Sequence, residues 1–116
     1  MLRSVIMSLT IFLSLNGYTA SNACPPSSST NTINFCSSFK ASAECYCTSS
    51  GLPKGMCNNM TQLYNRMISM FGSLQRACEF QHNTPTQNCI DDWNCYRNGG
   101  NNSQNELCSS TGKACE

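Results

Sequence analysis

The sequence predicts an all-α fold: a small disulfide-rich bundle of about four helices with one long central helix. Three observations support this class. The chain has 116 residues, and 10 of them are Cys, a density typical of disulfide scaffolds. Residues 24–116 contain all ten Cys, no Val, and only eleven Leu, Ile and Phe, so apolar burial alone would leave the fold weak and strand formers are scarce. Apolar residues recur at helical spacing between Cys57 and Cys78.

Residues 1–23 have the layout of a secretory signal peptide. A basic start at Arg3 is followed by an apolar run from Ser4 to Leu15, which is too short to span a bilayer, and by small residues before Cys24. We therefore expect secretion, with residues 24–116 forming a single cysteine-rich helical domain. Two alternatives are disfavoured. The apolar run has no polar face, unlike an amphipathic helix, and bacterial lipidation of Cys24 would leave an odd number of Cys.

The ten Cys are expected to form five disulfides, as is usual for an exported chain with an even count. Cys45 and Cys47 are too close to pair with each other, and a continuous helix would hold Cys57 and Cys78 too far apart. The rest of the pairing stays open. Zinc sites favour Cys-x-x-Cys, which is absent, so we expect no metal and no cofactor. The cysteines are Cys24, Cys36, Cys45, Cys47, Cys57, Cys78, Cys89, Cys95, Cys108 and Cys115.

The first half of the domain is expected to hold an extended lead-in and two helices. Pro25 and Pro26 favour extended backbone up to Thr30. A first helix is predicted over residues 31–45, capped by Thr30 or Asn31. The long helix is predicted from Pro53 to about Phe80, with Gly72 as its weak point. Its apolar stripe runs through Met56, Met60, Leu63, Met67, Phe71, Leu74 and Cys78.

Two shorter helices are predicted in the second half. Thr84 followed by Pro85 is typical of a helix start, and Gly99 after Asn98 is typical of a helix end. Residues 103–106 read Ser-Gln-Asn-Glu, a capping-box pattern. This pattern predicts a last helix that carries Leu107 and Cys108 and stops at Gly112.

Catalytic candidates are few. His82 is the only His, Glu79 lies just before it, and Asp91 and Asp92 form an acidic pair. A small secreted hydrolase built on these residues is one hypothesis. The simpler interpretation is that His82 lies at a solvated helix end and that the Asp pair favours the positive end of a helix dipole.

A hydrophobic ligand or partner could be bound by the Met-rich helix. Met side chains are flexible and polarisable, and they line adaptable grooves, although they more often fill a core. Trp93 and Tyr96 are candidate binding anchors on the next helix. The candidate partner or ligand face therefore comprises Met60, Met67, Met70, Trp93 and Tyr96, and a lipid carrier is a further hypothesis.

Two Asn residues match the N-glycosylation pattern Asn-x-Ser/Thr. Asn101 falls in a predicted loop rich in Gly and Asn, whereas Asn59 falls inside the predicted long helix. We expect modification more readily at Asn101 if the source cell glycosylates exported proteins.

The charge balance excludes a nucleic-acid partner. Residues 24–116 carry six basic and six acidic side chains, so no basic face is expected. Export, cross-linking and the scarcity of catalytic residues favour a secreted monomer that acts by binding an extracellular or host partner, a protein or a membrane surface. Such a protein would be a signal, a toxin-like factor or an effector and would not be an enzyme.

Overall fold

The computed structural model describes residues 24–81 and 83–116, so the predicted signal peptide and His82 lie outside the described residues. All regular secondary structure in the described part is helical, which confirms the all-α, disulfide-rich class. Five α-helices are followed by a short 3-10 turn: α1 (Phe35–Ser49), α2 (Lys54–Cys57), α3 (Met60–Phe71), α4 (Leu74–Phe80), α5 (Thr86–Asn98) and η2 (Cys108–Ser110).

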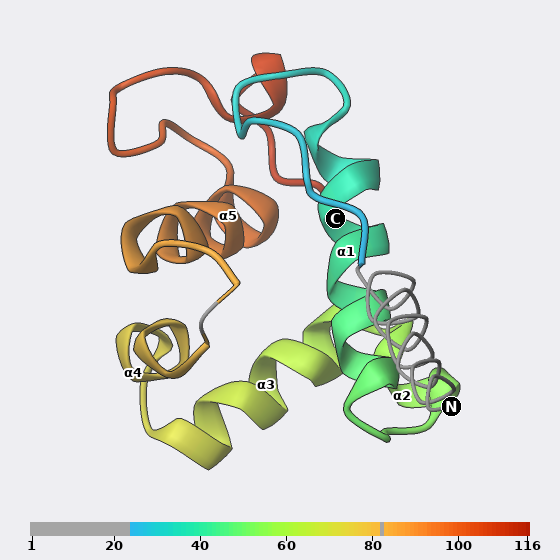
Figure 1. Ribbon diagram of the computed structural model, residues 1–116. Coiled ribbons are helices and arrows are strands. Elements are labelled where there is room, and N and C mark those ends of the chain that lie inside the picture. Colours follow the sequence, from blue (N-terminus) through green and yellow to red (C-terminus); the bar gives the residue numbers. More distant parts are fainter. Residues whose placement is uncertain (1–23, 82) are drawn as a thin grey trace, which may run out of the picture.

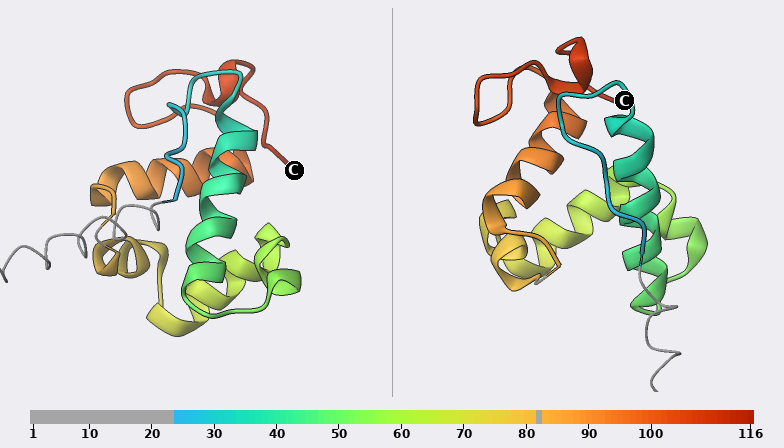
Figure 2. Two further views of the ribbon diagram at one scale, coloured as in Figure 1. Left: turned by 45° about the vertical axis from the view of Figure 1, so that its right-hand side comes forward. Right: turned by 45° about the horizontal axis from the view of Figure 1, so that its top comes forward.

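The helices surround an open centre rather than forming a parallel bundle (Figure 1). α1 forms one side, α3 runs across the base from α2 to α4, and α5 returns above α4 to meet α1 (Figure 1). The extended lead-in that follows Cys24 runs along α1, and the C-terminal loop covers the end where α1 and α5 approach each other (Figure 2).

The prediction of one continuous long helix is wrong, because the chain bends sharply at two points. α2 ends at Cys57, and Asn59 then caps α3 by accepting a hydrogen bond from the backbone N–H of Gln62 at 3.0 Å. α3 ends at Gly72, whose φ of 90° is left-handed and therefore suits glycine. Ser73 starts α4 by accepting from the N–H of Arg76. Side-chain caps at Asn59 and Ser73 satisfy backbone donors that a continuous helix would have used internally.

The predicted start of the first helix is also wrong. Hydrogen-bonded turns occupy residues 29–35, and α1 begins only at Phe35 with Asn34 at its N-cap position. The start of α5 is one residue later than expected, since Pro85 is its N-cap residue.

The predicted last helix is replaced by a loop and the short turn η2. The Asn102 side chain accepts hydrogen bonds from the N–H groups of Gln104 and Glu106, at 2.9 Å and 3.0 Å. Ser103 donates its hydroxyl to Asp91 on α5 instead of capping a helix. Asn side chains compete well with helical hydrogen bonding, which explains why the capping-box pattern fails here.

Five disulfides join the chain, and no described Cys is free. Cys45 and Cys47 bind different partners, which confirms that prediction. Cys57 and Cys78 also do not pair, although the continuous helix from which this was argued is absent. The pairs are Cys24–Cys45, Cys36–Cys115, Cys47–Cys57, Cys78–Cys89 and Cys95–Cys108.

Aromatic side chains build the core where α1 meets α5. Phe39 lies 5.0 Å from Trp93 in an edge-to-face arrangement and 5.4 Å from Tyr96, measured between ring centroids. Phe35 stacks on Phe39, and the buried disulfide halves Cys95 and Cys108 join the same cluster. The Tyr96 hydroxyl donates to Glu116 at 2.9 Å, and burial raises the pKa of Tyr96, with the bond to Glu116 adding to the effect.

Candidate functional site

An open cleft of about 880 Å³ lies at the centre of the molecule, between α1, the α3–α4 arm and α5. Its volume is in the range of small-molecule sites in proteins. The lead-in after Cys24 and the loop after α5 close its other sides. Disulfides fix several of these walls, because Cys24–Cys45 holds the lead-in to α1 and Cys78–Cys89 holds α4 to α5.

The α3–α4 side of the cleft is apolar. α3 begins with a buried Met60, whereas its later apolar residues are only partly covered, although Leu63 and Met67 still touch the core. Two of the most exposed large apolar side chains of the molecule are here: Met70 is 64% exposed and Phe80 65%. The apolar residues that line this side are Leu63, Met67, Met70, Phe71, Ala77 and Phe80.

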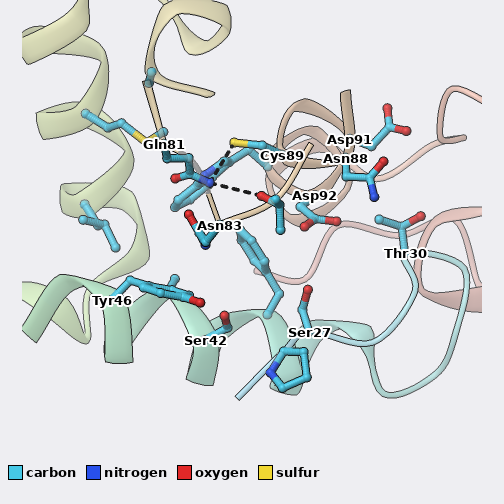
Figure 3. Close-up of a pocket in the computed structure, with 18 of the residues that line it drawn as sticks. Ser27, Thr30, Ser42, Tyr46, Gln81, Asn83, Asn88, Cys89, Asp91 and Asp92 are labelled. Carbon is cyan, nitrogen blue, oxygen red and sulfur yellow. Dashed lines mark hydrogen bonds between the residues drawn. The ribbon is translucent and has the colours of Figure 1, made fainter. Parts of the chain in front are cut away.

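The opposite side, formed by α1, the lead-in and α5, is polar. Ser27 comes from the lead-in, Ser42 and Tyr46 come from α1, and their hydroxyl groups point into the cleft (Figure 3). At the α4–α5 junction, the Gln81 side-chain amide donates to Thr84 and to the sulfur of Cys89, at 3.3 Å and 3.4 Å (Figure 3). The side formed by α1, the lead-in and α5 is therefore the more polar wall, although Phe39, Ala43 and Trp93 also line it.

Asp91 and Asp92 lie side by side in the second turn of α5 but have different surroundings. Asp91 accepts hydrogen bonds from the hydroxyl and the backbone N–H of Ser103, at 2.6 Å and 3.3 Å, and one from Gln87. It therefore positions the C-terminal loop against α5. α5 has no acidic residue in its first turn, so the helix dipole does not explain the pair.

Asp92 is the chemically unusual group of the cleft. It is partly buried on the α5 wall, and no described residue donates a hydrogen bond or an ion pair to it. Loss of hydration, together with the neighbouring charge of Asp91, raises the pKa of Asp92 from 3.8 to about 7. Asp92 is thus a carboxyl group that changes its charge near neutral pH.

The structure divides the predicted partner or ligand face between core and cleft. Met60 is 3% exposed and belongs to the core, whereas Met67 and Met70 line the cleft. Trp93 and Tyr96, at 5% and 3% exposed, are core residues and not exposed anchors, because the rings of α1 cover them. Trp93 still contributes to the cleft lining.

Of the hydrolase candidates, Glu79 and the pair Asp91–Asp92 do not come together in one site, and His82 lies outside the described residues. Glu79 is exposed on α4, where it accepts a hydrogen bond from Gln75, and it does not line the cleft with Asp91 and Asp92. Among the described side chains, no group of three or more His, Cys, Asp and Glu is placed to hold a metal ion.

The two glycosylation candidates are both exposed. Asn101 lies in the loop after α5, and Asn59 lies at the N-cap of α3, where its side-chain oxygen is already used by Gln62. Modification of Asn101, and of Asn59, stays a prediction.

Several site residues had no signal in the sequence. Ser42 and Tyr46 lie one turn apart on α1, and Ser27 joins them only because the lead-in folds back along α1. Phe80 was expected merely as the end of a helix, and only the turn at Gly72 brings it to 4.9 Å from Phe71. The neighbouring carboxyls Asp91 and Asp92 were visible, but their burial was not.

In comparisons with known proteins, no family model, curated protein or solved structure matches this chain. No helix within residues 24–81 or 83–116 is long and apolar enough to cross a membrane. Five disulfides are typical of proteins that meet an oxidising compartment.

Proposed function

We propose that this chain is a secreted, disulfide-stabilised binding protein that acts without catalysis, by holding a small amphipathic ligand in its central cleft. The observation that carries the proposal is the cleft itself: about 880 Å³, with an apolar wall on the α3–α4 arm and a polar wall on α1 and α5. An amphipathic molecule would cover the apolar side chains of one wall and satisfy the polar groups of the other.

Exposed Met and Phe side chains support a binding role. Met67 and Met70 are flexible enough to adapt to an apolar body, and Phe71 and Phe80 provide flat surfaces beside them. Exposed apolar side chains that gather at a concave site are more informative than ones scattered over a surface. Secretion is supported by the leader pattern of residues 1–23 and by the five disulfides.

A second candidate is docking of an extracellular protein partner at the rim of the cleft. Tyr46, which is 42% exposed, and Met70 stand on opposite sides of the opening and could contact the same partner. A signal, toxin-like factor or effector would use such a rim. The two candidates differ in whether a small molecule fills the cleft when the protein is alone.

Displacement of a neutral fluorescent probe, N-phenylnaphthylamine, tests the proposal. We expect the oxidised protein to bind the probe, and Met70→Glu to weaken binding at least tenfold by placing a charge on the apolar wall. Ile33→Glu is the matched control, because Ile33 is 79% exposed and does not line the cleft. Equal loss in both variants, or no binding by the parent protein, would contradict the proposal.

A further inference from the structure

We propose that the ligand is a cationic amphiphile, an amine carried on an apolar body, and that its ammonium group binds beside Asp92. This inference rests on the proposed function, since it concerns the same cleft. It adds the chemical class of the ligand and the residue that selects it.

The position of Asp92 is the first argument. It lies on α5, and Ser27 of the lead-in and Ser42 and Tyr46 of α1 line the same cleft (Figure 3). Within the described part of the chain, Asp92 has no hydrogen-bonding or ion-pairing partner. A partly buried carboxylate without a donor is costly, and a bound cation that donates hydrogen bonds would remove that cost.

The donor and acceptor chemistry is the second argument. An ammonium group has three donors and no acceptor. The polar wall offers complementary acceptors: the two carboxylate oxygens of Asp92 and the hydroxyl oxygens of Ser27 and Ser42. A carboxylate or phosphate on the ligand would instead place its charge against that of Asp92.

The charge of the whole cleft is the third argument. Among its described lining residues, four carry ionisable charge: Asp91 and Asp92 from α5, Glu106 from the C-terminal loop and Arg66 from α3. Arg66 is exposed, and Glu106 accepts a hydrogen bond from Asn102 at 3.1 Å, so both lie in well-hydrated or satisfied positions. The cleft lining therefore has an excess of acidic groups, which favours a cation on its α5 side.

The apolar side chains of the cleft require the cation to carry an apolar body that covers them. Met67 and Met70 of α3 and Phe80 of α4 line the cleft, so an apolar chain can lie along the arm while its amine reaches α5. A small hydrophilic amine would leave these apolar side chains exposed to water, and its only favourable interaction would be that between its ammonium group and Asp92. We therefore expect affinity to grow with the length of the apolar body.

The titration of Asp92 supports a dependence on pH. Desolvation holds the pKa of Asp92 at about 7 in the empty cleft, with Asp91 contributing. Below this value Asp92 is neutral and attracts the ammonium group weakly; above it the carboxylate is charged. The ligand would bind more tightly above neutral pH and be released on acidification.

Three probes with the same apolar chain test the inference: dodecylamine, dodecanol and dodecanoate, each used below its micelle concentration to displace N-phenylnaphthylamine. With the parent protein at pH about 8, we expect dodecylamine to bind at least tenfold more tightly than dodecanol, which a charge-assisted hydrogen bond can provide. Dodecanoate should bind most weakly. At pH about 5.5, the preference for the amine should disappear.

The variant Asp92→Asn tests whether Asp92 is the residue that causes the preference for dodecylamine. We expect it to remove the preference for dodecylamine and its pH dependence, while dodecanol still binds. Glu79→Gln removes an acidic charge from an exposed position outside the cleft and should change neither. A pH dependence that persists in Asp92→Asn would overturn the assignment.

The outcomes separate the two proposals. If none of the three probes binds, the proposed function fails. If all bind alike, or if dodecanol or dodecanoate binds best, the cleft binds ligands but the inference about a cation is wrong. Preference for dodecanoate would point to Arg66 as the charge that dominates.

Discussion

The end of the molecule where α1 meets α5 and the arm formed by α3 and α4 are stabilised in different ways. At the first, Phe39, Trp93 and Tyr96 pack ring against ring, and all three are buried. On the arm, Leu63, Met67, Phe71 and Leu74 are only partly covered. Disulfides hold the arm at both ends instead, through Cys57 before α3 and Cys78 in α4.

The difference shows how a chain with little apolar sequence can keep an open cleft. Several large aromatic side chains are concentrated in one core, against which Met60, Leu63 and Tyr64 of the arm also pack. Covalent links then hold the arm in place without requiring its apolar side chains to be buried. Those side chains stay available on the wall of the cleft.

Removing the longest-range disulfide should have the largest effect on stability. Cys36 and Cys115 are 79 residues apart, and losing the link that closes a loop of that length is expected to cost about 4.5 kcal/mol. The double variant Cys36→Ser with Cys115→Ser should therefore lower the free energy of unfolding in urea by about this amount. The pair Cys47–Cys57 closes only 10 residues and should cost about 3 kcal/mol. An equal or larger loss for the short loop would contradict the loop-length argument.

Truncating the aromatic core should have the second largest effect on the free energy of unfolding. Phe39 is 7% exposed and contacts three other rings, so Phe39→Ala should lower the free energy of unfolding by about 3 to 4 kcal/mol. Phe71→Ala is the matched change on the arm, where the ring is partly exposed and contacts Phe80. It should cost about 1 kcal/mol. Similar losses in thermal or urea unfolding would show that the arm is packed as tightly as the core.

Neutralising Asp92 should stabilise the protein, but only at high pH. Its folded pKa of about 7 lies above the ordinary 3.8, so between these values the folded state binds more protons than the unfolded state. The free energy of unfolding therefore falls as pH rises through this window. Asp92→Asn should be about 2 kcal/mol more stable than the parent above pH about 7, after allowance for partial exposure, and similar below pH about 4. Urea unfolding at both pH values measures the difference, and a gain at low pH would contradict the burial argument.

The smallest effect is expected at the most exposed position of the arm. Met70→Ser should change the free energy of unfolding by less than about 0.5 kcal/mol, since Met70 is 64% exposed and no core residue depends on it. The same variant should weaken binding of N-phenylnaphthylamine. A large loss of stability would show that Met70 packs in the core, and unchanged probe binding would show that it is not part of the site.

The all-α, disulfide-rich fold class was largely predictable from residue types, whereas the central cleft was not. Cysteine density and the absence of Val after residue 24 indicate a helical disulfide scaffold, and the short spacing of Cys45 and Cys47 requires two partners for them. The apolar stripe from Met56 to Cys78 predicted helix correctly, but it could not reveal the bends at Asn59 and Gly72. Periodicity records which residues share a helix face and not whether the helix axis changes direction.

The sequence by itself determined that this chain is helical, cross-linked, nearly uncharged overall and short of apolar side chains, because these properties follow from composition and local spacing. Only the tertiary structure decided which Met residues are buried, which cysteines pair and what surrounds Asp92. Each of those depends on contacts between segments far apart in the chain, such as the hydrogen bond between Asn102 of the C-terminal loop and Thr30 of the lead-in. Burial and pKa are properties of such contacts, and residue order alone does not specify them.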